Sequence, residues 1–267
     1  MSATILLIGA GNMGYAMLAG WLAQDPSLRV HVVEPFAAFR DRATALGAQS
    51  VADSADLPEG IRPDLVVLAV KPQMVGQVLR ACSRFQVATF VSVAAGITIA
   101  AMQGAIAAPI IRCMPNTPAA IGEGMMVLCA ATDVPQAARV LTERLMASSG
   151  AVAWLEDETL MDAVTAISGS GPAYVFHFIE ALTQAGLVFG LPSDIAALLA
   201  KQTIAGAGRM ALRSADTPTV LRQQVTSPNG TTAAALAVLM GHNALIELVV
   251  TAATAARDRG VELGKGA

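Results

Sequence analysis

The residues most informative about chemistry are three glycines spaced Gly-x-Gly-x-x-Gly near the start of the chain. Gly9, Gly11 and Gly14 follow a short apolar run and open a stretch with helical periodicity. Glycines let the backbone turn tightly and approach a pyrophosphate, and a helix start offers that anion free N–H groups and partial positive charge. Because the motif lies between an expected strand and an expected helix, it predicts a dinucleotide site that also includes Asn12 and Met13.

Glu34 ends the second expected strand, twenty residues after Gly14. A carboxylate there can accept hydrogen bonds from ribose hydroxyls and repels a 2′-phosphate, which favours NAD over NADP. Arg40 and Arg42 follow closely and could bind a phosphate instead. Glu34 could also be an ordinary surface residue, so the residues leave the choice of cofactor open.

Three further segments follow expected strands and should meet at one edge of a parallel sheet, where ligands bind in such folds. Pro72 holds the residue before it extended, and two prolines make the last segment rigid. The residues predicted to contact the cofactor in these segments are Ala69, Val70, Lys71, Pro72, Ala95, Gly96 and Asn116. The simpler alternatives are a solvated lysine and a turn asparagine.

A second candidate site precedes a helix in the last third of the chain. Residues 226–232 offer several backbone N–H groups and four hydroxyls, which suits a carboxylate better than it suits a plain helix cap. The residues predicted to bind the substrate here are Ser227, Asn229, Gly230, Thr231 and Thr232.

No side chains form an obvious acid–base pair or metal-ligand cluster, so we expect no metal site. Of the three histidines, His31 falls in an expected strand, His177 in an expected helix, and His242 between two helices. With so few titratable groups, the chemistry is expected to come from a cofactor that the protein positions.

Two kinds of element must position these residues. Short apolar strands alternate with helices in the first half, which is typical of a parallel sheet covered on both faces, whereas only helices follow. The expected strands are 5–8, 30–33, 65–70, 88–93, 109–113 and 125–130, and the expected helices are 13–23, 36–46, 75–82, 136–147, 173–189, 193–213, 232–240 and 243–263. The fold class is therefore α/β, with an N-terminal Rossmann-type doubly wound sheet in residues 1–160. An all-α C-terminal domain for substrate binding and oligomerisation follows in residues 161–267.

Composition excludes several classes of protein. The 267 residues are 54% hydrophobic and 14% charged, which excludes intrinsic disorder, and a net charge of −3 does not suit a nucleic-acid binder. Residues 85–111 carry no charge, but polar residues, glycine and proline interrupt them, so a strand, a turn and a helix fit better than a membrane span.

Three features bear on location and assembly. Three cysteines without paired spacing indicate a reducing compartment, and residues 1–4 lack the positive charge of a signal peptide, so we expect a cytoplasmic protein. The last helices are apolar around most of their circumference, which predicts oligomerisation through this half.

Taken together, the motifs resemble those of the pyrroline-5-carboxylate reductases over nearly the whole chain. The resemblance is carried by residues 9–14, 69–72, 95–97, 112–118, 168–174 and 226–236. It implies NAD(P)H-dependent hydride transfer to the imine carbon of 1-pyrroline-5-carboxylate, giving L-proline in the last step of proline biosynthesis.

The resemblance also implies roles for single residues. Backbone N–H groups of Gly230, Thr231 and Thr232 would hold the substrate carboxylate, and the Thr232 hydroxyl would lie near the ring nitrogen, as a catalytic group. The C-terminal helices would interleave in a homodimer, which could assemble further. The family often uses NADPH, whereas Glu34 favours NADH. The family usually has a glycine where this chain has Asn229, a residue that tolerates left-handed backbone.

The residues leave three alternative functions open. A related reductase could act on a six-membered cyclic imine. β-Hydroxyacid dehydrogenases share the layout, but their catalytic lysine would fall at Val175. A sensing module could bind NAD(P) without catalysis, and turnover of any cyclic imine acid would exclude it.

Overall fold

The computed structural model describes residues 3–85 and 88–265. These fall into two compact units, one made of residues up to 170 together with those from 256 onward, and the other of residues 171–255. The predicted domain boundary at residue 160 stays a prediction.

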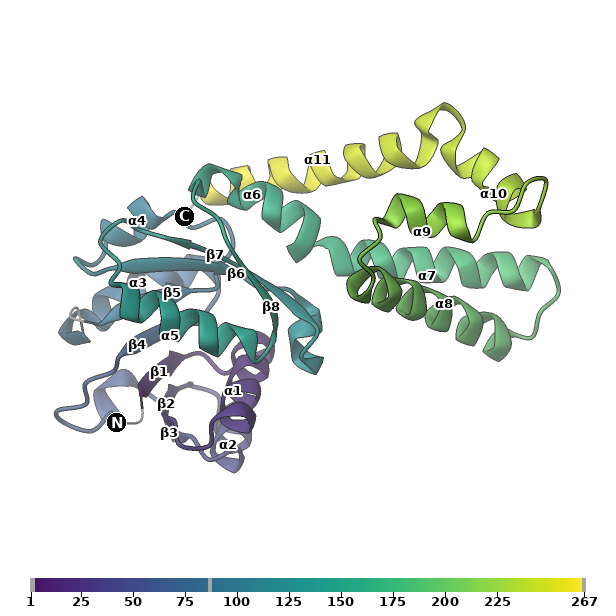
Figure 1. Ribbon diagram of the computed structural model, residues 1–267. Helices are drawn as coiled ribbons and strands as arrows, with labels where there is room; N and C mark the ends of the chain where they lie inside the picture. The colour runs from purple at the N-terminus through teal and green to yellow at the C-terminus, as the bar shows by residue number, and fades with distance from the viewer. Residues whose placement is uncertain (1–2, 86–87, 266–267) are drawn as a thin grey trace. The chain divides into compact units, whose positions relative to one another are not determined.

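The described residues of the first unit form an eight-stranded sheet (Figure 1). The strands are β1 (Thr4–Ile8), β2 (Arg29–Val33), β3 (Gln49–Val51), β4 (Leu65–Leu68), β5 (Thr89–Ser92), β6 (Ile110–Met114), β7 (Gly124–Ala130) and β8 (Gly150–Trp154). Their order is β3-β2-β1-β4-β5-β6-β7-β8, and every neighbouring pair is parallel except β6 and β7.

Helices cover both faces of this sheet. The helices that lie between strands are α1 (Asn12–Gln24), α2 (Ala37–Ala45), α3 (Val75–Ala81), α4 (Ile99–Gln103) and α5 (Gln136–Ala147), and α6 (Met161–Val164) follows the last strand. From β1 the chain crosses towards β2, and from β4 it crosses the opposite way towards β5. Right-handed crossovers therefore place α1 and α3 on opposite faces. α1 packs beside α5, and α3 beside α4.

The central strands are buried along their whole length because helices cover both faces. Every residue of β1, β4 and β5 is buried. The predicted fold class is confirmed. The structure adds the short edge strands β3 and β8, which we did not predict, and it reverses β7 against an expectation of parallel strands.

The uncharged stretch 85–111 contains β5, a turn, α4 and the start of β6, as its interrupting polar residues predicted. Residues 86 and 87 of this stretch, and residues 1 and 2 of the amino-terminal segment, lie outside the described residues.

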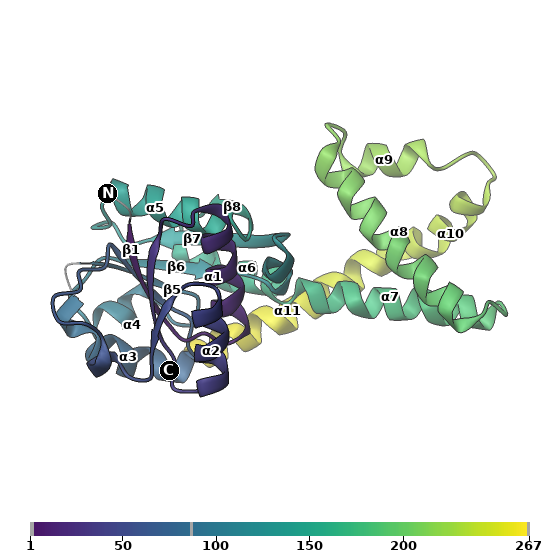
Figure 2. The same ribbon diagram turned by 90° about the horizontal axis from the view of Figure 1, so that it is seen from below.

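The second unit is helical. Its helices are α7 (Gly171–Val188), α8 (Ser193–Arg213), α9 (Pro218–Gln224) and α10 (Thr231–Met240), and α11 (Ala244–Lys265) begins in it (Figure 2). α7 packs against α8. The expected helices end at residue 213 and resume at residue 232, which leaves Thr217 and Pro218 between helices. They instead start α9, with the Thr217 hydroxyl accepting from the Val220 N–H and Pro218 at the first helical position.

One helical stretch in the described part of the chain, Thr231–Gly264, is long and apolar enough to cross a membrane by length and composition alone. A kink at His242 divides it into α10 and α11. No part of its most apolar window is buried within the chain. These apolar faces need a cover that the chain itself does not provide.

Candidate active site

The glycine-rich loop joins β1 to α1. Gly11 caps α1 without any side-chain hydrogen bond, and the first turn carries no acidic residue. The N–H groups at this helix start are therefore not bound by a capping side chain, and no negative charge in the first turn opposes an anion there.

The glycines of this loop differ in the space around them. A Cβ on Gly9 would lie 2.6 Å from the Ala69 carbonyl oxygen, and one on Gly14 would overlap the Gly9 carbonyl oxygen. A Cβ on Gly11 would meet no atom within 4 Å. The loop is thus closed towards the sheet and open where it faces outward, and these residues fit a dinucleotide pyrophosphate. Of the other two predicted contacts, Asn12 is exposed and Met13 half-buried.

Glu34 lies directly beside this loop. It is 4% exposed, and its two carboxylate oxygens accept from the Ala10 N–H at 2.8 Å and from the Phe36 N–H at 3.0 Å. It is therefore not an ordinary surface residue. These two hydrogen bonds hold the carboxylate just after β2, next to the glycine-rich loop.

The two neighbouring arginines are engaged locally. Arg40 donates to the carbonyl oxygens of Glu34 and Pro35, at 2.8 and 2.6 Å. Arg42 donates to the Ala10 carbonyl oxygen at 2.8 Å, and its guanidinium lies over the rings of Tyr15 and Phe39. Both side chains thus support the loop and its surroundings.

Ala69, Val70, Lys71 and Pro72 follow β4, the strand next to β1. The strand order reverses direction between β1 and β4, which is where ligands bind in such sheets. Lys71 is exposed and extended, with φ −63° and ψ 146°, as the following proline dictates. The Lys71 ammonium is therefore free to approach a bound molecule.

Ala95 and Gly96 lie in the loop after β5, where Gly96 has a φ of +78°. The loop leads into α4, whose first N–H, that of Ile99, donates to Glu158 Oε1 at 2.7 Å. The same oxygen accepts from Arg112 Nη1 at 2.6 Å, and Arg112 is only 5% exposed. Sequence reasoning missed this pair because its partners are 46 residues apart.

Asn116 follows β6, and its side-chain amide forms hydrogen bonds within the chain. Its Nδ2 donates to the Ser168 carbonyl oxygen at 3.2 Å, and its Oδ1 accepts from the Met125 N–H at 2.9 Å. Ser168 belongs to a π-helical turn, Thr165–Gly169, a feature frequent at functional sites. The amide therefore ties this turn to the loop after β6.

The predicted substrate residues form one turn in the second unit. Asn229 has a φ of +59°, the left-handed conformation that asparagine tolerates. The Gly230 N–H donates to the Ser227 carbonyl oxygen, and a Cβ on Gly230 would overlap the Ser227 hydroxyl. Gly230 caps α10 without a side-chain hydrogen bond, and the first turn, which begins with Thr231 and Thr232, has no acidic residue. This helix start suits an anion such as a carboxylate.

The structure therefore gathers the predicted residues in two places. Those predicted for the cofactor lie at the carboxyl edge of the sheet in the first unit. Those predicted for the substrate lie in one turn of the second unit.

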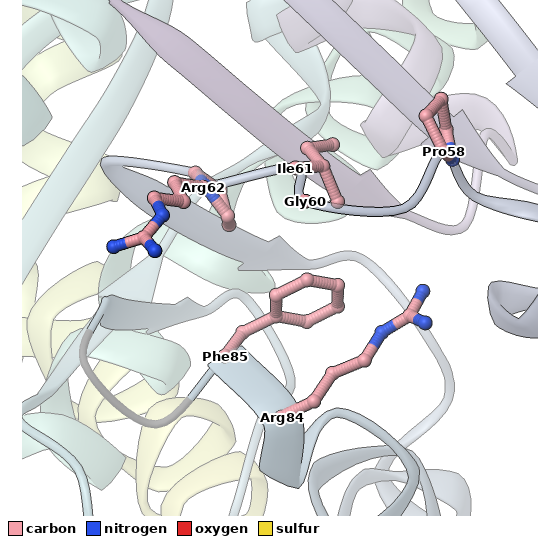
Figure 3. A pocket seen from close by; sticks show the side chains of 7 residues that line it. Pro58, Gly60, Ile61, Arg62, Arg84 and Phe85 are labelled. Carbon is pink, nitrogen blue, oxygen red and sulfur yellow. The ribbon is translucent and has the colours of Figure 1, made fainter.

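Two cavities lie at the opposite edge of the sheet. One, of about 370 Å³, is lined by residues just before β4 and β5, including Arg62, Arg84 and Phe85 (Figure 3). The other, of about 380 Å³, includes Arg29 and His31 of β2. Because ligands of such sheets bind at the carboxyl ends of the strands, neither cavity is the nucleotide site.

The thiols are poor candidates for chemistry. Cys82, Cys113 and Cys129 are free and buried. Burial raises the pKa of Cys82 to about 11 and that of Cys113 to about 12, so both stay protonated at neutral pH. Among residues 3–85 and 88–265, no group of three histidine, cysteine or acidic side chains could hold a metal ion.

Two family models match the chain. The model of the pyrroline-5-carboxylate reductase dimerisation domain matches residues 158–263, and the model of the coenzyme F420-dependent NADP oxidoreductases matches residues 4–96.

Full-length relatives agree with both models. The pyrroline-5-carboxylate reductase of Pseudomonas aeruginosa is 40% identical over 98% of this chain and 97% of its own. The solved structure of a pyrroline-5-carboxylate reductase from Coxiella burnetii has a TM-score of 0.92 at 35% identity, covering 98% of this chain and 99% of its own. That of a Plasmodium falciparum pyrroline carboxylate reductase, with NADP bound, has a TM-score of 0.84 at 28% identity, covering 98% of both chains.

Proposed function

The chain belongs to the pyrroline-5-carboxylate reductase family, and we propose that its two helix starts divide the work of this reaction between cofactor and substrate. The enzyme is an NAD(P)-dependent oxidoreductase that reduces 1-pyrroline-5-carboxylate to L-proline. It is a homodimer with a small-molecule substrate.

We assign the cofactor to the carboxyl edge of the first unit. The observation that carries this assignment is the glycine-rich loop, closed against Ala69 but open outward at Gly11, at a helix start without a side-chain cap. The reduced nicotinamide supplies a hydride when it is bound. The α1 N-terminus receives the pyrophosphate, and Lys71 and the loop of Ala95 and Gly96 line the edge beyond it.

We assign the substrate to the turn at residues 227–232. The N–H groups at the start of α10 hold the substrate carboxylate, and the Thr232 hydroxyl forms a hydrogen bond to the ring nitrogen. A protonated imine is already electrophilic, so the chain's task is to position it rather than to activate it strongly.

Glu34 gives this site a preference for NADH over NADPH. Its buried carboxylate lies against the loop that receives the cofactor, where it opposes a 2′-phosphate. Arg40 and Arg42, the groups that could offset this charge, are already bonded to backbone carbonyl oxygens.

We place the dimer interface on the helices of the second unit and on α11, where the large exposed apolar side chains are concentrated. Larger assemblies would build on this dimer. The free cysteines suit a reducing compartment, so we place the enzyme in the cytoplasm.

The first experiment is turnover of 1-pyrroline-5-carboxylate with NADH and NADPH in separate concentration series, followed by the absorbance of the reduced nicotinamide. Turnover with a higher kcat/KM for NADH is expected. A higher kcat/KM for NADPH contradicts the role of Glu34. Absence of turnover by protein that binds a cofactor would favour a six-membered cyclic imine or a sensing module.

The Thr232→Ala variant tests the substrate turn. Loss of the hydroxyl should lower kcat about tenfold or more with cofactor KM retained, because the ring nitrogen loses a hydrogen-bond partner. Thr251→Ala is the matched control, since the Thr251 hydroxyl donates to the Glu247 carbonyl oxygen within α11. Unchanged kcat and imine KM in Thr232→Ala would exclude the catalytic role.

A further inference from the structure

We infer that the end of α11 positions the cofactor-binding loop, with Gly264 as the positioning residue. This rests on the proposed function, which gives the loop after β5, residues 93–98 and here called the β5 loop, to the cofactor. A C-terminal helix would thereby act on a site built on the N-terminal sheet.

Two glycines make the contact. A Cβ on Gly264 would lie 2.6 Å from the Gly96 carbonyl oxygen, and a Cβ on Gly96 would lie 3.3 Å from the Gly264 nitrogen. Separations below about 3 Å are well inside van der Waals contact, and the opposing atoms are backbone, which cannot rotate away. The helix end and the loop approach this closely only because neither residue has a side chain.

Gly96 is constrained twice. Its φ of +78° favours glycine whatever surrounds it, and its carbonyl oxygen is the atom that Gly264 approaches. The β5 loop therefore turns at the point where α11 meets it. A shift of α11 would press on the residue that sets the path of the loop.

The other end of the β5 loop is also fixed. Glu158 Oε1 accepts from the Ile99 N–H at 2.7 Å, and Arg112 holds the same oxygen at 2.6 Å from a buried position. The loop thus has a firm anchor at the start of α4, which leaves the α11 contact to fix the part around Gly96.

The part of α11 that belongs to the first unit also lies close to α6. Gly260 faces Asp162 of α6, with 3.4 Å between a Cβ placed on Gly260 and Asp162 Oδ1. The last residues of α11 belong to the first unit, whereas its first residues belong to the second. One helix therefore carries both apolar dimerisation surface and the contact that holds the β5 loop.

The test compares two identical substitutions one helical turn apart. Gly264→Ala adds a methyl group that must displace the Gly96 carbonyl, whereas Gly260→Ala adds the same group with ordinary van der Waals room. We measure cofactor Kd by the fluorescence of the bound reduced nicotinamide, kcat and KM for each substrate, the melting temperature, and oligomeric state.

Gly264→Ala should raise the Kd and KM of the reduced cofactor about tenfold, because small misplacements of a positioning group are costly. Its kcat at saturating cofactor, its imine KM and its dimer should be retained. Gly260→Ala should match the wild type. Equal cofactor Kd in the two variants would overturn the inference, as would a loss confined to kcat or melting temperature.

A second measurement needs no variant. In hydrogen exchange of the wild-type enzyme, reduced cofactor should increase protection of residues 256–264 together with that of the β5 loop. Protection of the loop alone would overturn the inference. Failure of the wild type to turn over 1-pyrroline-5-carboxylate would instead count against the proposed function, so the two failures are distinguishable.

Discussion

The two units differ in how far they bury their own apolar side chains. The first unit closes its own core, since the central strands are buried from end to end between two layers of helices. In the described helices α7 to α10 the only buried residues are Gly186, Ala196 and Ala200. Residues as large as Phe189 and Leu248 remain exposed. The first unit buries its apolar side chains by itself, whereas the second leaves them open to the partner that we propose.

The largest expected effect tests close packing in the first unit. Gly14→Ala places a methyl group on the Gly9 carbonyl oxygen, and overpacking of this kind should lower the free energy of unfolding by about 3 kcal/mol. Gly11→Ala has open space and should lower the free energy of unfolding by no more than about 1 kcal/mol, because alanine is a poorer N-cap, while weakening cofactor binding. Urea unfolding followed by circular dichroism measures both. Equal stability of the two variants would contradict this packing.

The next effect tests the open surface of the second unit. Leu248→Glu puts a charge on a side chain that is 67% exposed within the chain, and it should raise the dimer dissociation constant about a hundredfold. Val140→Glu on α5, at 56% exposure in the first unit, is the matched control and should leave the dimer intact. Sedimentation equilibrium measures both variants. Equal dissociation constants would remove the contrast between the units.

A smaller effect is expected when a hydrogen-bonded side-chain amide is removed from each of the two units. Asn116→Ala leaves the Ser168 carbonyl and the Met125 N–H without this partner in a half-buried place, which should cost about 2 kcal/mol of unfolding free energy. Gln224→Ala removes an exposed bond to Asp216 and should cost about 0.5 kcal/mol or less. Chemical denaturation of both variants gives the two costs. The reverse order would show that Asn116 is not a structural tie.

The smallest effect concerns pH. Burial, and then the nearby positive charge of Arg29, lowers the pKa of His31 in the folded chain. The unfolded chain therefore takes up the proton first, and the stability that neutral His31 provides is lost as the pH falls below about 6.5. His31→Gln should show a shallower loss of melting temperature between neutral and mildly acidic pH. Parallel pH profiles for variant and wild type would contradict this.

The sequence was sufficient for most of the sheet and its helices because their signals are local. Apolar runs marked β1 and β4, and α5 and α8 have the predicted bounds. β3 was not predicted because it has only three residues, too few to show the alternation of apolar and polar residues that indicates a strand. The start of α9 was interpreted as a connector because Thr-Pro marks helix starts and turns alike.

The candidate site likewise combines features that local sequence patterns predict with features that they do not. The loop of Gly9 to Gly14 and the turn at Asn229 have local patterns that predict their backbone geometry. The ties made by Asn116, by Glu158 and by Gly264 depend on residues far away in the sequence, so no local pattern could reveal them. The motifs that bear on the chemistry could be predicted from the sequence, whereas the contacts that hold them in place could not.

The buried thiols bear on how this enzyme withstands its surroundings. With their pKa raised by burial, Cys82 and Cys113 carry almost no thiolate at neutral pH, and no described solvent-facing cysteine is present to react first. Reagents that react with thiolates therefore find no reactive cysteine among the described residues while the chain is folded. Thiol-directed inactivation of this enzyme should therefore proceed only as fast as the chain opens to expose these cysteines.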